Sequence, residues 1–185
     1  MLEIKFHGRG GQGIVLASQM LGLAFFKAGN YPQCYSLFGG ERRGAPVVSF
    51  LRVDENEILL KCEIKQPNEL LCFDETLISP QELHNQMVPG SKILVNTGQS
   101  RGYFKRFLGF TLGLVDGRAV AEQFGLGHMI NTAMVGAYCR LNGNLALKYV
   151  FEAVREMVPA KEKANLDAVR QGYSAVSIID SERVT

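Results

Sequence analysis

The chain has 185 residues, 46% of them hydrophobic, and its 20 basic and 18 acidic residues leave a formal net charge of +2. This length and composition fit one globular domain whose core needs neither disulfides nor a metal for stability. The small net charge argues against a nucleic-acid surface and against attraction to an anionic membrane, so any anion site must be local.

The N-terminal segment predicts a strand, a tight loop and a buried helix. Residues 2–7 alternate apolar and polar, residues 8–13 are rich in glycine, and residues 14–28 form an apolar helical stretch closed by Gly29 and Asn30. The apolar stretch is interrupted by polar residues and is shorter than the roughly 20 residues that a membrane helix needs. We therefore expect a buried helix and no membrane association.

Two further strands are predicted at residues 33–38 and 46–53, with a polar turn at residues 39–45 between them. Because the turn is short, these strands could pair as a hairpin.

The middle of the chain has short apolar runs separated by helical or turn-like stretches, which is the alternation of an α/β sheet. The runs are residues 70–73, 92–95 and 110–115. After Arg118 the pattern becomes helical, with helices expected at residues 119–124, 131–141, 145–157 and 161–173. The last residues, 179–185, are expected to fray.

These elements predict an α/β fold, a three-layer sandwich with a mostly parallel sheet and a helical C-terminal region. No repeat, low-complexity tract or linker interrupts the chain, so residues 1–185 are expected to form a single domain.

The four cysteines predict free thiols rather than a metal site. Cys34, Cys62, Cys72 and Cys139 lie far apart, without the close pairs that zinc or iron–sulfur ligation usually shows. Neither a secretory signal nor a disulfide pattern is recognisable, so a cytoplasmic location is expected.

The glycine-rich loop is the first candidate site, because Gly8 to Gly13 match the pattern G-x-G-x-x-G between a strand and a helix. Such a loop can present backbone N–H groups to an anion. A nicotinamide site would also need an acidic residue after the second strand, yet none lies between Glu3 and Glu41. A tight turn alone explains the glycines about as well as ligand contact does; Arg9 and Gln12 favour contact.

The second candidate site is the predicted turn that carries Arg42 and Arg43 between glycines. Two guanidinium groups there could bind phosphate or carboxylate bidentately. The alternative is a solvated turn in which Glu41 pairs with an arginine.

The remaining polar candidates receive structural explanations. His7, His84 and His128 are widely separated and are expected to be ordinary strand-end or surface residues. Asp116 and Gly117 follow an apolar strand, where capping of the next helix is the favoured interpretation.

Two motifs together identify a family. The sequence His-Gly-Arg-Gly-Gly-Gln-Gly at residues 7–13, with Phe-Gly-Gly-Glu-Arg-Arg-Gly-Ala-Pro-Val at residues 38–47, resembles the gamma family of pyruvate (2-oxoacid):ferredoxin oxidoreductases. Residues 131–137 resemble a later helix of the family, and Glu-Arg-Arg-Gly-Ala-Pro at residues 41–46 is similar to its pyruvate or branched-chain 2-oxoacid branch.

The resemblance implies an accessory subunit that is inactive alone and carries no catalytic or metal-binding residue of its own. Thiamine diphosphate and iron–sulfur clusters would lie on alpha, beta and, in some members, delta partner subunits, which pass electrons to ferredoxin. A contact between two copies of the chain is also plausible for paired heteromers. The chain itself would contact coenzyme A, and the candidate residues are Arg9, Gly10, Gly11, Gln12, Arg42 and Arg43.

Two alternatives remain at this point. The chain could be a purely structural module whose motifs contact only protein, and no sequence feature opposes this. Less favoured is a free nucleotide-dependent oxidoreductase, because the acidic ribose ligand is missing.

Overall fold

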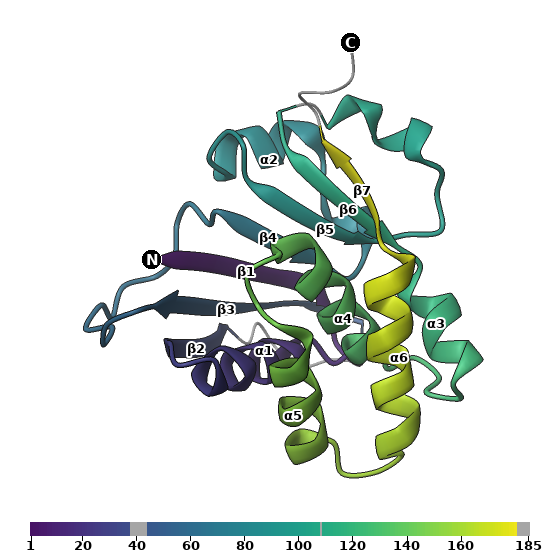
Figure 1. Cartoon of the computed structure of the whole chain (residues 1–185). Coiled ribbons are helices and arrows are strands. Elements are labelled where there is room, and N and C mark those ends of the chain that lie inside the picture. The colour runs from purple at the N-terminus through teal and green to yellow at the C-terminus, as the bar shows by residue number, and fades with distance from the viewer. Residues whose placement is uncertain (38–43, 108, 181–185) are drawn as a thin grey trace.

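The computed structural model describes residues 1–37, 44–107 and 109–180 (Figure 1). Its strands are β1 (Leu2–Arg9), β2 (Tyr31–Leu37), β3 (Pro46–Asp54), β4 (Glu69–Cys72), β5 (Lys92–Asn96), β6 (Thr111–Val115) and β7 (Ser177–Asp180). Its α-helices are α1 (Ile14–Lys27), α2 (Pro80–Gln86), α3 (Gly117–Gln123), α4 (Asn131–Asn142), α5 (Leu147–Met157) and α6 (Glu162–Ala175). Two short 3₁₀ helices, η1 (Glu75–Leu77) and η2 (Arg101–Arg106), complete the described elements.

All seven described strands form one mixed sheet in the order β2-β3-β1-β4-β5-β6-β7. Strands β1, β4, β5 and β6 are parallel neighbours, whereas β3 pairs antiparallel with both β1 and β2, and β7 pairs antiparallel with β6. The α/β class is confirmed, and so is the hairpin-like pairing of β2 with β3. A parallel arrangement holds for the centre of the sheet and not for its two edges, so the prediction of a mostly parallel sheet is confirmed only in part.

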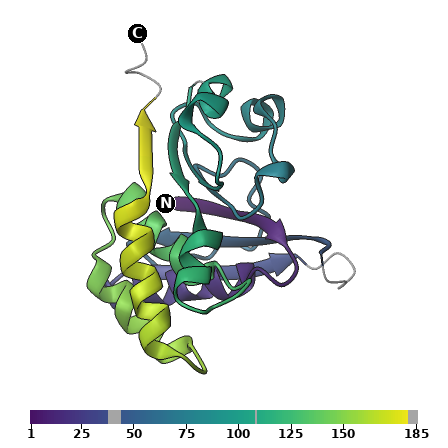
Figure 2. The same cartoon turned by 90° about the vertical axis from the view of Figure 1, so that its right-hand side faces the viewer.

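Helices cover both faces of the sheet, as the three-layer prediction requires (Figures 1 and 2). Alternate residues of β4 separate into two cores: Leu71 packs with α1 and α4, while Leu70 and Cys72 pack with Leu83 of α2 and the phenylalanines around η2. The side chains of β4 are buried on both faces, which is typical of a central parallel strand.

The C-terminal helices confirm the predicted helical region and pack tightly against one another. Gly136 of α4 and Gly172 of α6 lie at the crossing: a Cβ added to either would come within 2.1 Å of a backbone oxygen of the facing helix. Only glycine permits this approach, and it brings the apolar face of α4 into the larger core.

The end of the described chain differs from expectation. Residues 179–185 are predicted to fray, but Ile179 and Asp180 belong to β7, which pairs with β6 through Leu112↔Ile179 and Thr111↔Asp180. This short strand gains its hydrogen bonds only because α6 returns the chain to the sheet edge. Residues 181–185 lie outside the described part.

Within the described residues, no helix combines the length and the apolar character needed to cross a membrane.

Candidate functional site

The glycine loop joins the end of β1 to the start of α1. Gly11 has φ +99° and Gly13 has φ +79°, a backbone region that residues with a Cβ rarely adopt. Gly13 is the N-cap of α1, no side chain caps this helix, and its first turn contains no acidic residue. The positive end of the helix dipole is therefore left for another partner.

The Arg9 side chain fastens this loop to the segment that follows β4 and to the residue Gly44 before β3. Its Nε donates to Asp74 Oδ2 at 2.6 Å, and its other nitrogens donate to the Gly44 carbonyl at 3.2 Å and to Thr76 Oγ1 at 3.1 Å. A guanidinium carries five N–H donors, and the described part of the chain uses three of them. Burial alone would raise the pKa of Asp74, but hydrogen bonds from Thr76 and Arg9 outweigh it, and the pKa lies below its usual value.

Gln12 holds the loop from inside. Its Oε1 accepts from the Arg9 backbone N–H at 2.7 Å, and its Nε2 donates to the Phe73 carbonyl at 3.2 Å. The Gly10 N–H donates to the Ala45 carbonyl at 2.9 Å. The side chain of Gln12 therefore holds the loop in shape from its inner side.

A second helix begins beside the loop. Asn131 is the first residue of α4, its side chain is 2% exposed, and its Oδ1 has no hydrogen-bond partner among the described residues. A Cβ placed on Gly13 would lie 3.0 Å from the Asn131 Cβ. Two uncapped helix N-termini thus meet at Gly13 and Asn131, next to a buried acceptor that lacks a donor.

A cleft of about 650 Å³ opens beside the glycine loop and these two helix ends. Its described lining residues are Arg9, Gly10, Gly11, Gln12, Gly44, Arg118, Glu122, Gly127, His128 and Ile130. Four of the residues singled out from the sequence therefore gather in one cavity. The cleft lies where β1 and β6 run into the helices that follow them, as ligand sites in open α/β sheets usually do.

Arg118, His128 and Asn131 were not recognised from the sequence as site residues. The turn at Asp116 does cap α3, as predicted, since Asp116 Oδ1 accepts from the Ala119 N–H at 2.9 Å; Arg118, two residues later, reaches the cleft. His128 is exposed, as expected for a surface histidine. Only the Asp-Gly turn after an apolar strand offered a local signal for any of the three.

Arg42 and Arg43, the other predicted contacts, lie outside the described residues. Gly44, the next residue along the chain, lines the cleft.

The topology separates this loop from a nicotinamide-binding unit. In that unit the strand after the first helix lies parallel beside the first strand. Here α1 leads to β2, which lies at the sheet edge, antiparallel to β3. The missing acidic residue and the different strand order therefore both argue against a nicotinamide-binding unit.

A family model described as pyruvate ferredoxin/flavodoxin oxidoreductase matches residues 3–175. The chain belongs to this family. The resemblance inferred from the two motifs is confirmed, and the free nucleotide-dependent oxidoreductase loses its support.

Similar proteins cover nearly the whole chain. It is 40% identical over 186 residues to the "Pyruvate/ketoisovalerate oxidoreductases common subunit gamma" of Thermococcus kodakarensis, covering 97% of this chain and 100% of that protein. The crystal structure of pyruvate oxidoreductase subunit PORC from Thermotoga maritima matches with a TM-score of 0.83 and 32% identity, covering 97% and 98% of the two chains.

A 2-oxoglutarate:ferredoxin oxidoreductase from Magnetococcus marinus, solved with coenzyme A bound, contains the same fold within a longer chain. The TM-score is 0.76 at 17% identity, covering 100% of this chain and 31% of that one.

Proposed function

We propose that the chain is the gamma subunit of a cytoplasmic 2-oxoacid:ferredoxin oxidoreductase of the pyruvate or branched-chain type. It works in a complex with alpha and beta subunits, and with a delta subunit where the assembly has one. Thiamine diphosphate and iron–sulfur chemistry belong to those partners, which transfer electrons to ferredoxin. The near-complete coverage of gamma-type relatives supports this role.

Within that complex, the cleft beside the glycine loop receives part of coenzyme A. The observation that carries this proposal is the meeting of two uncapped helix N-termini at Gly13 and Asn131. Helix N-termini attract phosphate groups, and Arg118 adds a guanidinium at the same cleft. The Oδ1 of Asn131, which is buried beside Gly13 and has no partner among the described residues, adds an acceptor next to this end of the cleft.

The other predicted contacts fit this arrangement in different ways. Gly11 would present its backbone N–H group, and Gly10, whose N–H is held by the Ala45 carbonyl, would allow the ligand to approach the loop closely. Arg9 and Gln12 would hold the loop in shape and leave only spare donors for the ligand. Arg42 and Arg43 remain candidate phosphate ligands next to Gly44.

Co-purification tests the assembly. The tagged chain is recovered anaerobically from its host, and the eluate is assayed for coenzyme-A-dependent reduction of ferredoxin by several 2-oxoacids. Larger partners and activity in the eluate are expected. A chain that elutes alone and binds a nicotinamide nucleotide would contradict the proposal.

Variants of the active complex test the cleft. Arg118→Ala, Arg42→Ala and Arg43→Ala should each raise the KM for coenzyme A about tenfold, since a hydrogen bond to a charged group contributes about 1.5–3 kcal/mol. The subunits should still co-purify. Arg101→Ala, which changes an exposed arginine that does not line the cleft, is the matched control. Unchanged KM values in all three variants would favour a purely structural role.

A further inference from the structure

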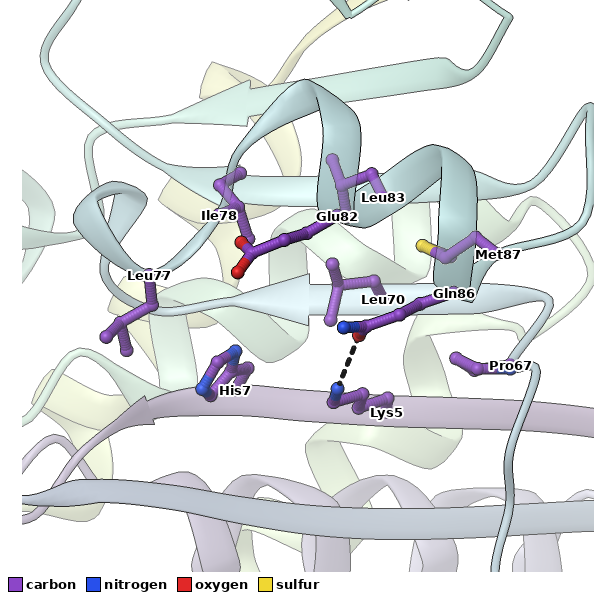
Figure 3. Close-up of a pocket in the computed structure, with 10 residues that line it drawn as sticks. All are labelled: Lys5, His7, Pro67, Leu70, Leu77, Ile78, Glu82, Leu83, Gln86 and Met87. Carbon is purple, nitrogen blue, oxygen red and sulfur yellow. Dashed lines mark hydrogen bonds between the residues drawn. The ribbon is translucent and has the colours of Figure 1, made fainter.

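A second, smaller pocket lies between β1 and α2 (Figure 3). Lys5 and His7 form its floor on the side of β1 that faces away from α1, and Glu82 and Gln86 of α2 form the opposite wall. None of its described lining residues lines the cleft beside the glycine loop. The two sites are therefore separate.

The floor of this pocket supplies donors that the chain does not use fully. Lys5 Nζ donates to Gln86 Oε1 at 3.1 Å, and its other two N–H groups have no acceptor among the residues that the structure describes. The His7 imidazole makes no hydrogen bond to any residue that the structure describes. The two residues are two positions apart on one strand, so both side chains stand on the same face, roughly 6–7 Å apart. That spacing allows one carboxylate to interact with both.

The opposite wall carries a negative charge. Ser79 Oγ donates to Glu82 Oε2 at 3.0 Å, and Glu82 Oε1 has no partner in the described part of the chain. Lys5, His7 and Glu82 line the same pocket. Burial lowers the pKa of both Lys5 and His7, while the charge of the Glu82 carboxylate acts to raise both. Glu63 acts on Lys5 in the same sense as Glu82.

Three more charged groups act on the pKa of His7: Lys5 and Arg9 lower it, and Asp74 raises it.

The size and the apolar surface of the pocket limit the ligand. Its volume is about 90 Å³, and at roughly 10–15 Å³ per water-sized group it has room for about six to nine such groups. Leu70 and Leu83 line it between the two polar walls. A ligand of this size that matches the pocket carries an anionic group, a cationic group and a short aliphatic chain.

We propose that this pocket binds a small aliphatic α-amino acid as its zwitterion. The carboxylate lies against Lys5 and His7, the ammonium group against Glu82, and the side chain on Leu70 and Leu83. A simple monocarboxylate would leave its charge facing Glu82 without compensation, and a simple amine would face Lys5. This site is independent of the proposed coenzyme A contact and of the assembly of the oxidoreductase.

A titration of the full-length chain, followed by amide chemical shifts, tests the ligand class. L-valine is compared with isovalerate, which lacks the amino group, and with isobutylamine, which lacks the carboxylate. We expect saturable shifts in β1 and α2 with L-valine, and binding about tenfold weaker for each analogue, a difference of about 1.4 kcal/mol. Isovalerate binding as tightly as L-valine, or no saturable shift in the millimolar range, would overturn the proposal.

Two variants separate the role of the floor from the role of the opposite wall. Lys5→Met should weaken L-valine binding about tenfold, whereas Glu82→Gln, which retains the helix-capping geometry, should remove the preference for L-valine over isovalerate. Lys61→Met makes the same change at an exposed lysine outside the pocket and should leave binding unchanged. The same spectra report whether each variant is folded. Wild-type affinity in folded Lys5→Met, or an unchanged preference in folded Glu82→Gln, contradicts the proposal.

Discussion

The helix crossing of α4 and α6 and the glycine loop before α1 both depend on glycine, but for opposite reasons. At the crossing, Gly136 and Gly172 lie against backbone atoms and leave no room for a Cβ. In the loop, a Cβ on Gly11 would meet nothing within 4 Å, and its φ of +99° is the constraint. At the crossing, glycine lets the backbones of two helices touch. In the loop, glycine lets the backbone adopt a positive φ beside an open cleft.

The largest loss of stability is expected from a substitution at the crossing of α4 and α6. Gly136→Ala forces a Cβ to within 2.1 Å of the Val169 carbonyl oxygen, so α4 and α6 must separate, and the free energy of unfolding should fall by about 3 kcal/mol or more. Urea unfolding measures this, with Gly172→Ala expected to behave alike. Gly102→Ala, whose Cβ would meet only Ser100 Oγ at 3.7 Å, is the control. If Gly136→Ala lowers the free energy of unfolding no more than Gly102→Ala does, the two helices adjust freely to the added Cβ.

The buried end of α4 should give the next largest effect. Tyr138 is 1% exposed, its hydroxyl donates to Glu69 Oε2 at 2.5 Å, and Asn142 Nδ2 donates to the same hydroxyl at 3.2 Å. Burial, followed by the charge of Glu69, raises the pKa of Tyr138 well above its usual value, so the hydroxyl keeps its proton. Tyr138→Phe leaves a buried carboxylate short of a donor and should cost about 1–3 kcal/mol of unfolding free energy.

Tyr31→Phe removes the hydroxyl of a tyrosine that is 50% exposed and should be close to neutral. Equal losses in the two tyrosine variants would argue against the buried network.

Gly11→Ala sharpens the contrast between the two regions. The backbone strain at positive φ should cost about 1–2 kcal/mol of stability, less than at the crossing. It should also raise the KM for coenzyme A of the assembled enzyme, which a still-folded Gly172→Ala should not. Steady-state kinetics measures the KM for coenzyme A, and urea unfolding measures the stability of each variant. If both glycine variants change KM alike, the loop has no special role in the cleft.

The smallest effect is expected from the contact that fastens the loop. The pKa of Asp74 is lowered in the folded chain, so its contribution to stability is present above the unfolded value of about 3.9 and is lost as pH falls through the lower folded value. Because the Arg9 side chain is 39% exposed, this contribution should be below about 1 kcal/mol.

Asp74→Asn should therefore lose slightly less stability in acid than the wild type. Urea unfolding at neutral and acidic pH measures the difference, and parallel pH profiles would contradict it.

Much of the fold could be predicted because its signals are local. The apolar runs of β4, β5 and β6 and the glycines of the first loop are readable from neighbouring residues, and the structure places strands and a positive-φ loop there. Helix α2 and strand β7 are short, and each is held by packing against elements distant in sequence. Local patterns cannot show such stabilisation.

By itself, the sequence determined the order of the main elements, the glycine loop and the family, because each depends on residues close together in the chain. The tertiary structure alone brought Arg118 and His128 to the cleft that begins at Arg9, and Asn131 to the side of Gly13. It also placed Glu82 opposite Lys5 and His7. The residues that meet at each of these two places are more than 70 positions apart in the sequence. Only the pairing of strands and the packing of helices fix the distance between them in space.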